Sequence, residues 1–316
     1  MLVPMYFLIG IWGGPQRMYA AIKFFLYTLF GSVFMLLALL ALYYYSDPHT
    51  FSLITLIHTV GSIDATIWGL SVKYLIWMAL FIGFAIKVPI VPFHTWLPLA
   101  HVEAPTAISV ILAGVLLKMG TYGLLRISYH LLPGEVVNFA YILAVLGVIN
   151  IIWGATNAIA QIDMKKMVAY SSVSHMGYVL MGIATLDNIG VGGAVLQMFS
   201  HGIMTALMFL LVGAIYERTH TRDISVLNGL ASRMGVNSFF FAIAGLASLG
   251  LPGLSGFIAE FMVFTGAFRT YLPLAILAVI GAALTAIYIL RLLARTFMGE
   301  PDEQWAGLTD ASPVEM

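Results

Sequence analysis

Apolar stretches long enough to cross a lipid bilayer recur along almost the whole chain and leave little room for a soluble fold. A crossing takes about 20 residues at ~1.5 Å each, and eight stretches reach this length while a ninth, at the start, is shorter. The approximate spans are 2–13, 23–45, 74–98, 106–130, 136–159, 166–186, 191–215, 236–268 and 272–297. They lack the alternating pattern, in segments of about ten residues, that a membrane β-barrel requires. The sequence therefore predicts an all-α, polytopic membrane bundle in which strands are not expected.

The composition supports a membrane protein and excludes several other classes. Of the 316 residues, 61% are hydrophobic and 9% are charged, whereas a soluble domain has about 25% charged residues. The formal net charge is zero, so the chain lacks the surplus of Lys and Arg that neutralises nucleic-acid phosphates. The absence of Cys excludes disulfides, thiolate-held iron–sulfur clusters and Cys-based zinc sites. The lipid bilayer is the expected surrounding, and no nucleic-acid partner is expected.

The distribution of basic residues predicts how the spans are oriented. If the span ends alternate sides, one side collects Arg17, Lys23, Lys165, Lys166, Arg218, Arg222, Arg233, Arg291 and Arg295, and the other collects Lys73, Arg126 and Arg269. Since the side richer in Lys and Arg faces the cytoplasm, the first residue is expected outside and the last inside. Residues 1–298 form the predicted transmembrane domain.

Both ends of the chain look incomplete as sequence. The stretch up to residue 14 is short for a crossing, has no basic segment before it and has no small-residue cleavage site. It is typical of the second half of a longer helix. Residues 299–316 form a polar tail that carries five of the fourteen acidic residues and stops without a structural ending. We therefore expect the chain to be truncated at both ends.

Two of the spans contain helix-breaking residues near their middle. The motif KVPIVPFHTWLP places three prolines in span 74–98, and SLGLPGLSGFIAE places Pro252 among glycines in span 236–268. Irregular backbone at membrane depth is tolerated where protein or water satisfies it, so both breaks should line an interior cavity. Broken helices in both halves of a chain are typical of inverted-repeat transporters. The alternative is a pair of ordinary proline kinks.

Three ionisable residues lie deep within the predicted spans. Lys87 and Lys118 are each some 18 Å from either end of their span, and Glu260 follows the second break. Each costs ~2.5–3.5 kcal/mol at the bilayer centre. Interhelical salt bridges would leave one cation unpaired within this set, whereas a Lys whose proton affinity depends on a nearby carboxylate can act as a gated proton carrier. A proton relay is therefore the favoured interpretation.

Polar residues at helical spacing mark three further stripes. These are Gln197, His201 and Thr205; Ser171, His175 and Tyr178; and Asn150, Gly154, Asn157 and Gln161. Such stripes usually form interhelical hydrogen bonds, which is the simpler interpretation for His175 and the Asn stripe. For His201 a proton-transfer role is equally well supported, since His titrates near neutrality.

A possible metal-ligand set, His94, His101 and Glu103, lies near the basic-side end of span 74–98. The spacing matches no metal motif. We expect these three residues to be solvated or capping, and we predict no metal site.

Long motifs resemble one family of membrane proteins. The segments LVPMYFLIGIWGG, AIKVPIVPFHTWLPLAHVEAPTAISVILAGVLLKMGTYGLLR, MKKMVAYSSVSHMGYVLMGI, QMFSHGIMTALMFLLVGAIYERTHTRD and LGLPGLSGFIAEFMVF closely resemble the antiporter-like membrane subunits of bacterial NADH:quinone oxidoreductase, respiratory complex I. Within that family, HVEAPT followed by LLKMGTYGLLR is similar to the M type rather than the L, N or antiporter types. The wider family includes multi-subunit cation/proton antiporters and the membrane arms of energy-converting hydrogenases.

The resemblance implies a fold of fourteen helices with two inverted five-helix repeats, broken at the seventh and twelfth helices. The nine spans match the fifth to thirteenth of these. By the same resemblance, Lys87 matches the lysine of the seventh helix, Lys118 that of the eighth, His201 the polar relay of the eleventh and Glu260 the glutamate of the twelfth. We place His175 in this expected proton relay as well.

The resemblance also implies a function and its surroundings. The protein is expected to translocate protons in a bacterial plasma membrane, beside L and N type homologues, as part of an enzyme that couples NADH oxidation to quinone reduction. FMN, iron–sulfur clusters and quinone are expected on partner subunits, and no cofactor on this one. The alternatives are a subunit of a cation/proton antiporter, a hydrogenase membrane arm, or a purely structural spacer.

Two departures from the family pattern stand out. The family's fifth helix carries a glutamate that pairs with the seventh-helix lysine, and Met1 begins just after that position. Leu99 stands where relatives often have a charged residue.

Overall fold

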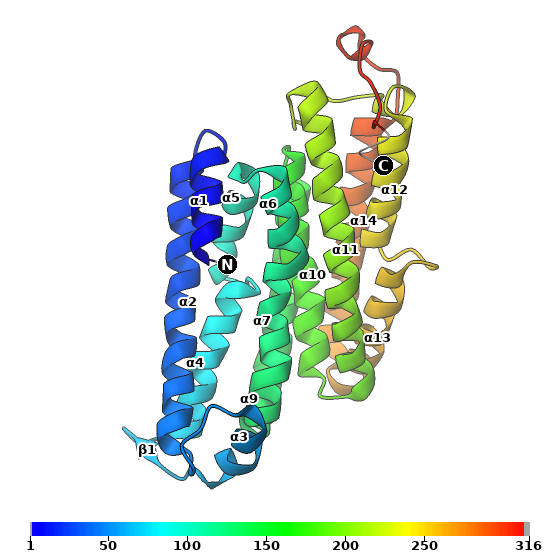
Figure 1. Cartoon of the computed structure of the whole chain (residues 1–316). Coiled ribbons are helices and arrows are strands. Elements are labelled where there is room, and N and C mark those ends of the chain that lie inside the picture. The colour runs from blue at the N-terminus through cyan, green and yellow to red at the C-terminus, as the bar shows by residue number, and fades with distance from the viewer. Residues whose placement is uncertain (1, 313–316) are drawn as a thin grey trace.

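The computed structural model describes residues 2–312, and most of them are helical (Figure 1). The α-helices are α1 (Leu2–Trp12), α2 (Arg17–Tyr45), α3 (Leu53–Thr59), α4 (Val72–Lys87), α5 (Trp96–Glu103), α6 (Thr106–Ile111), α7 (Leu117–Gly123), α8 (Tyr129–Leu131), α9 (Pro133–Ala160), α10 (Met164–Ala184), α11 (Asn188–Thr219), α12 (Gly235–Ser248), α13 (Ser255–Thr270) and α14 (Leu272–Phe297). Two π-helical turns, η3 (Leu112–Leu116) and η4 (Leu124–Ser128), connect α6, α7 and α8, and 3₁₀ turns are η1 (Val60–Ser62), η2 (Phe93–Thr95), η5 (Leu230–Ser232) and η6 (Glu303–Trp305).

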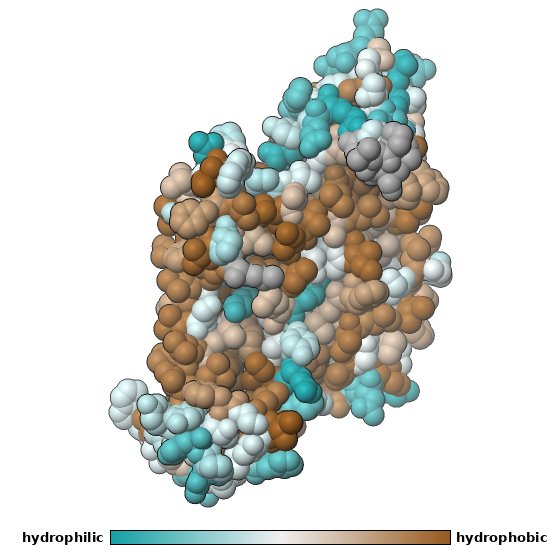
Figure 2. Space-filling view, in the orientation of Figure 1, coloured by the Kyte–Doolittle hydropathy of each residue, from teal (hydrophilic) through white to brown (hydrophobic). Residues whose placement is uncertain are grey.

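Among residues 2–312, five helices are long and apolar enough to cross a membrane: α2, the continuous helix Thr106–Leu131, α9, α11 and α14. The helices run side by side along one axis (Figure 1). On the face that Figure 2 shows, apolar residues cover most of the middle of the molecule and polar residues gather at both ends. The predicted helical membrane fold is confirmed at this level. One detail was missed, because β1 (Thr66–Ile67) and β2 (Leu70–Ser71) form a short antiparallel hairpin in the loop before α4.

Glycines allow neighbouring helices to approach closely. A Cβ atom placed on Gly147 of α9 would lie 2.9 Å from the carbonyl oxygen of Gly177 of α10, and one on Gly177 would lie 2.5 Å from the carbonyl oxygen of Gly147. Small residues at helix interfaces are typical of membrane bundles, where close backbone packing replaces the hydrophobic effect between helices. This contact fixes α10, which carries His175, against α9.

The backbone between α4 and α5 is held by side chains from other parts of the fold. Asn150 of α9 accepts a hydrogen bond from the backbone N–H of Val91 at 2.8 Å and donates to the carbonyl of Pro89 at 3.2 Å. The indole of Trp96 donates to the carbonyl of Ile86 at 2.9 Å. The interhelical role predicted for Asn150 is confirmed, because its amide satisfies backbone groups that a membrane interior would leave without partners.

The backbone between α12 and α13 turns at two glycines. Gly250 has φ +74° and Gly253 has φ +102°, conformations that glycine adopts readily because it has no Cβ atom. The hydroxyl of Ser255, the first residue of α13, lies 2.8 Å from that of Ser200 on α11. In Figure 1, α12 lies above this connection and α13 below it.

Side chains from the start of α10 and from the loop after α11 hydrogen-bond to the end of α5 at one end of the bundle. Arg222 Nη1 donates to the carbonyl of Val102 at 2.9 Å, and Lys165 Nζ donates to that of Ala104 at 2.5 Å. Both carbonyls lie at the C-terminal end of α5, where cations are favourable. Arg222 also contacts Asp163 at 3.6 Å. Two of the basic residues counted on the expected cytoplasmic side therefore hold the end of α5.

The described part of the polar tail packs on the bundle. The carboxylate of Asp310 accepts hydrogen bonds from the backbone N–H groups of Val236 at 2.7 Å and Asn237 at 3.2 Å, and Trp305 is buried. The residue preceding α12, Met234, offers no capping side chain. Asp310 therefore caps α12 from a distant part of the chain.

Replacing Asn150 tests how the first interruption is stabilised. Asn150→Leu would leave the buried Val91 N–H and Pro89 carbonyl without partners, at about 1–3 kcal/mol for each group. Asn157→Leu is the matched control, because the Asn157 amide is half-buried and bonds only within its own helix, to the carbonyl of Trp153. Equilibrium unfolding in SDS–detergent mixtures should show a large loss for the first variant and about 0.5 kcal/mol or less for the second. Equal losses would contradict the role of Asn150.

The Asp310 cap predicts a pH dependence. Burial alone would raise the pKa of Asp310, but backbone N–H groups of Val236, Ala311 and Asn237 outweigh it and lower the pKa below 3.8. The stabilisation is therefore complete above pH 3.8 and is lost as the pH falls through the lowered value. Asp310→Ala should speed hydrogen exchange at Val236 and Asn237 at neutral pH, by an amount equivalent to about 0.5–2 kcal/mol, and Glu300→Ala should not. Unchanged exchange in the Asp310 variant would refute the cap.

Candidate functional site

Lys118 and His201 form a direct contact in the middle of the bundle. Lys118 lies on α7, just after the π-helical turn η3, and its Nζ atom is 2.6 Å from Nδ1 of His201 on α11. The same Nζ donates to the carbonyl of Ala113 at 2.5 Å. His201 is fully buried, and π-helical turns occur frequently at functional sites. The amine is thus held by one titratable partner and one backbone carbonyl.

His175 continues the row from His201. The two imidazole rings are 5.3 Å apart between centroids, and His175 is 1% exposed. Its Nε2 atom lies 2.9 Å from the hydroxyl of Ser248, the last residue of α12. The ring is therefore fixed at the point where α12 ends.

Glu260 closes the row from α13. Its Oε1 atom lies 3.4 Å from Nδ1 of His175, and the amide nitrogen of Gln197 lies 3.4 Å from both atoms. Glu260 is 6% exposed. A Cβ atom at Gly250 would lie 2.9 Å from Glu260 Oε2, so the glycine turn leaves room for the carboxylate.

These contacts bring together four of the five predicted residues: Lys118, His201, His175 and Glu260. Gln197 and Ser248 also contact this row but were not predicted as site residues. Gln197 belongs to a polar stripe, and Ser248 lies at the edge of the second break. The stripe containing His201 did include Gln197, but sequence spacing does not show what an amide contacts on another helix. For Ser248, position at the edge of the glycine-rich break was the only available signal.

Lys87 lies apart from this row. It is half-buried at the end of α4 and lines a cavity of about 220 Å³ with Thr28, Ser32 and Leu116, among others. Within residues 2–312 no hydrogen bond or ion pair links Lys87 to Lys118. Lys87 therefore faces a mainly apolar cavity to which Thr28 and Ser32 contribute polar side chains.

The expectation for His94 and His101 was wrong, because neither is solvated. The indole of Trp153 donates to Nε2 of His94 at 3.2 Å, and His101 is fully buried with its ring stacked on Phe209 at 4.5 Å. The short helix α5 does reach one end of the bundle, but these two side chains are directed toward neighbouring helices rather than solvent. Across residues 2–312 no three His, Cys, Asp or Glu side chains converge as a metal site would require.

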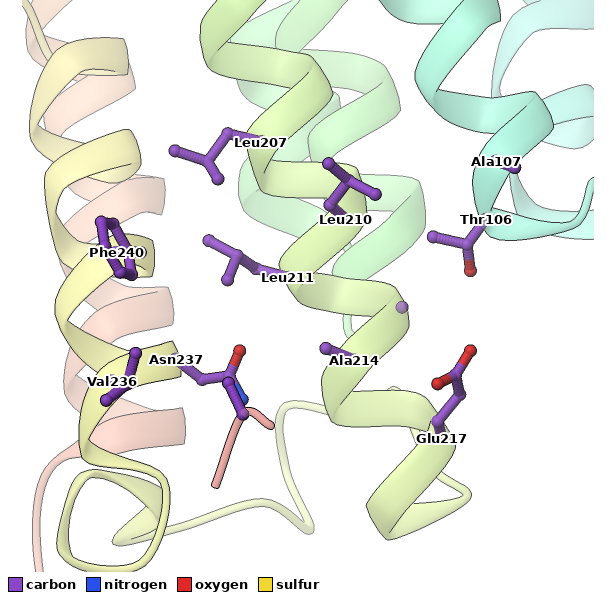
Figure 3. A pocket seen from close by; sticks show the side chains of 12 residues that line it. Thr106, Ala107, Leu207, Leu210, Leu211, Ala214, Glu217, Val236, Asn237 and Phe240 are labelled. Atoms are coloured by element: carbon purple, nitrogen blue, oxygen red, sulfur yellow. The ribbon is translucent and has the colours of Figure 1, made fainter. Parts of the chain in front are cut away.

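Larger cavities lie elsewhere in the bundle, and one of them reaches the row. One of about 560 Å³ opens between α11 and α12 and is lined mainly by apolar side chains such as Leu207, Leu211 and Phe240, with Glu217 at one side (Figure 3). None of the four connected residues lines it. A second, of about 660 Å³, is an apolar groove between α7 and α11 that reaches Lys118.

Comparisons with known proteins place these residues in a family context. The family described as NADH:quinone oxidoreductase/Mrp antiporter, TM, matches residues 1–285. NADH-quinone oxidoreductase subunit M of Rickettsia prowazekii is 50% identical over 95% of this protein and 60% of its own length. NAD(P)H-quinone oxidoreductase chain 4 1 of Synechococcus elongatus is 47% identical over 100% of this protein and 59% of its own length. The protein thus spans about 60% of the length of these relatives.

The solved structure of respiratory complex I from Thermus thermophilus holds a similar subunit. It superposes with a TM-score of 0.91 at 32% identity, and the similarity covers 99% of this protein and 65% of that subunit. The similarity includes every element that carries the four connected residues.

Gly250 offers a test of the space around Glu260. Both Gly250→Ala and Gly253→Ala force an L residue into the left-handed region at ~1–2 kcal/mol, but only the Cβ atom at position 250 meets Glu260; at position 253 it has open space. We expect similar losses of stability by equilibrium unfolding. The infrared carboxyl band of Glu260 is assigned by its loss in Glu260→Gln. Of the two glycine variants, only Gly250→Ala should change this band. An unchanged band in that variant would contradict the packing described.

Proposed function

The protein belongs to the membrane-subunit family shared by NADH:quinone oxidoreductases and Mrp antiporters, and from this premise we propose that it translocates protons across the membrane as an M type subunit of NADH:quinone oxidoreductase. The observation that carries the proposal is the buried row Lys118, His201, His175 and Glu260. Polar groups of this kind are expensive inside a membrane and typically mark ion pathways.

In the proposed mechanism the row passes protons between groups that can each gain and lose one. A proton on the Lys118 amine is donated to Nδ1 of His201 across 2.6 Å. The neighbouring imidazole of His175 receives a proton next and passes it on to the Glu260 carboxylate, which exchanges it with one aqueous face. Imidazole suits the middle of the row because its ring nitrogens can gain and lose a proton near neutral pH.

Lys87 is proposed as the gated donor to Lys118. The cavity beside it has hydroxyls from Thr28 and Ser32 and extends to Leu116 and Met119, which flank Lys118 in sequence. Its volume of about 220 Å³ exceeds the ~10–15 Å³ that one water needs. Water in this cavity would supply the link that the side chains do not make directly.

We further propose that the protein crosses a bacterial plasma membrane nine times, within an inverted-repeat architecture. The pairs α4 with α5 and α12 with α13 are then discontinuous crossings whose irregular segments lie at membrane depth. Support comes from Asn150 and the glycine turn, which satisfy or permit the irregular backbone. The loop end that holds Lys165 and Arg222 would face the cytoplasm.

The energy for translocation is proposed to come from other subunits. Relatives are subunits of NADH-quinone oxidoreductase, and the proposal places FMN, iron–sulfur clusters and quinone on partner subunits. L and N type homologues are the expected neighbours in the membrane. This subunit would contribute the proton path rather than a redox centre.

Lys118→Ala tests the proposed function. In the assembled complex in sealed vesicles, proton uptake per NADH oxidised should fall by more than about tenfold, because the row loses its first donor; tenfold corresponds to ~1.4 kcal/mol in a barrier. Lys73→Ala is the matched control, since Lys73 is also a helical Lys but pairs with the exposed Asp64 at 3.9 Å. Retained uptake in Lys118→Ala with normal assembly would refute the relay.

A cation/proton antiporter subunit is the second candidate, because the family description itself includes Mrp antiporters. The same vesicles distinguish the two. Proton movement that requires a sodium gradient and proceeds without NADH would favour the antiporter, whereas movement that requires NADH and is unaffected by sodium would favour the oxidoreductase subunit.

A further inference from the structure

Gln197 occupies an unusual position between the last two titratable groups of the row. It lies on α11, one turn before His201, and is 1% exposed. Its amide nitrogen is 3.4 Å from His175 Nδ1 and 3.4 Å from Glu260 Oε1. Its amide oxygen is buried and has no hydrogen-bond partner among residues 2–312. Buried polar atoms normally have a hydrogen-bond partner, so an unpaired amide oxygen at this position needs an explanation.

While the amide stands between them, His175 and Glu260 form no close hydrogen bond with each other. Their facing atoms are 3.4 Å apart, beyond the 2.7–3.2 Å of a normal N–H···O hydrogen bond. The amide between them cannot itself carry the proton, because it has no titration near neutral pH. It can, however, present either two N–H donors or an oxygen acceptor to the same space.

We propose that Gln197 is a gate for the proposed relay: its amide presents NH₂ to His175 and Glu260 when the pair holds no proton, and rotates to present oxygen when the pair holds one. The inference rests on the proposed function and adds a positioning residue to it.

The proton balance of the cycle follows from hydrogen-bond complementarity. With Nδ1 of His175 unprotonated and Glu260 ionised, two acceptors face the amide, and NH₂ donates to both. When Nδ1 takes up a proton it becomes a donor. Two donors, Nδ1–H and the amide NH₂, would then face each other, so rotation that brings the amide oxygen toward Nδ1 is favoured. The carboxylate then loses the amide bond and has the Nδ1–H as its nearest donor. After transfer, neutral Glu260 donates its O–H to the amide oxygen, and release of that proton restores the first state.

The other titratable groups packed around the pair lie on four helices. His201 on α11 and Lys118 on α7 lie on one side, and the hydroxyls of Tyr178 on α10 and Tyr288 on α14 interact electrostatically with Glu260. Tyr178 and Tyr288 are both fully buried. Gln197 is the side chain that touches both members of the pair.

The test combines transport with infrared spectroscopy on the assembled complex. Gln197→Leu should lower proton uptake per NADH at least about fivefold while assembly is retained. Ser172→Ala is the control: Ser172 is also buried, lies three residues before His175 and bonds only to the carbonyl of Val168 in its own helix. Isotope-labelled glutamine in the unaltered complex makes the amide carbonyl band of Gln197 visible, and the loss of that band in Gln197→Leu assigns it. The band should shift over the pH range in which the carboxyl band of Glu260 titrates. The shift should disappear in Glu260→Gln.

The outcomes separate the gate from the proposed function. If Lys118→Ala stops uptake but Gln197→Leu leaves it normal, the gate is wrong and the relay stands. If both variants take up protons normally, the relay itself fails. A Gln197 band that stays fixed while Glu260 titrates overturns the gate, even if Gln197→Leu fails to assemble.

Discussion

Polar groups inside a membrane-spanning bundle must find their partners within the protein, and this constraint organises the structure. Backbone groups freed between α4 and α5 bond to the amide of Asn150 and the indole of Trp96. Charged side chains obey the same requirement, so Lys118 contacts His201, and Glu260 contacts His175 and Gln197. A row of titratable groups results because each needs a polar neighbour and the lipid supplies none.

The interruption between α12 and α13 lies at one end of this row. α12 stops at Ser248, whose hydroxyl bonds to His175, and the glycine turn that follows leaves space for Glu260. A continuous helix would place ordinary side chains and closed backbone hydrogen bonds in that region. The breaks and the buried charges are therefore parts of one arrangement, in which irregular backbone provides the room and the hydrogen-bonding groups that charges require.

Much of the fold and part of the site could be predicted from sequence, because a charge or a proline within an apolar run is visible in one dimension. Lys118 and Glu260 were identified in this way, and His201 from helical spacing and the family resemblance. The structure brings these three together with His175. Contacts between helices were not predictable, since spacing along one helix does not show which face meets which neighbour. Gln197 was therefore seen only as a member of a stripe.

The errors have the same origin. His101 was expected to be solvated because it lies near a span end, but its ring is buried and stacks on Phe209 of α11. Asp310 was one acid in a polar tail until its contact with the start of α12 was visible. Both roles depend on chain segments more than 70 residues apart, which no local pattern reports.

The most direct test of the account is a structure of the assembled complex in lipid, at a resolution that shows ordered water. The account predicts an unbroken series of hydrogen bonds, through side chains or water, from Lys87 to Glu260. A dry apolar gap within this series, or side chains of Lys118 and Glu260 directed into lipid, would contradict it.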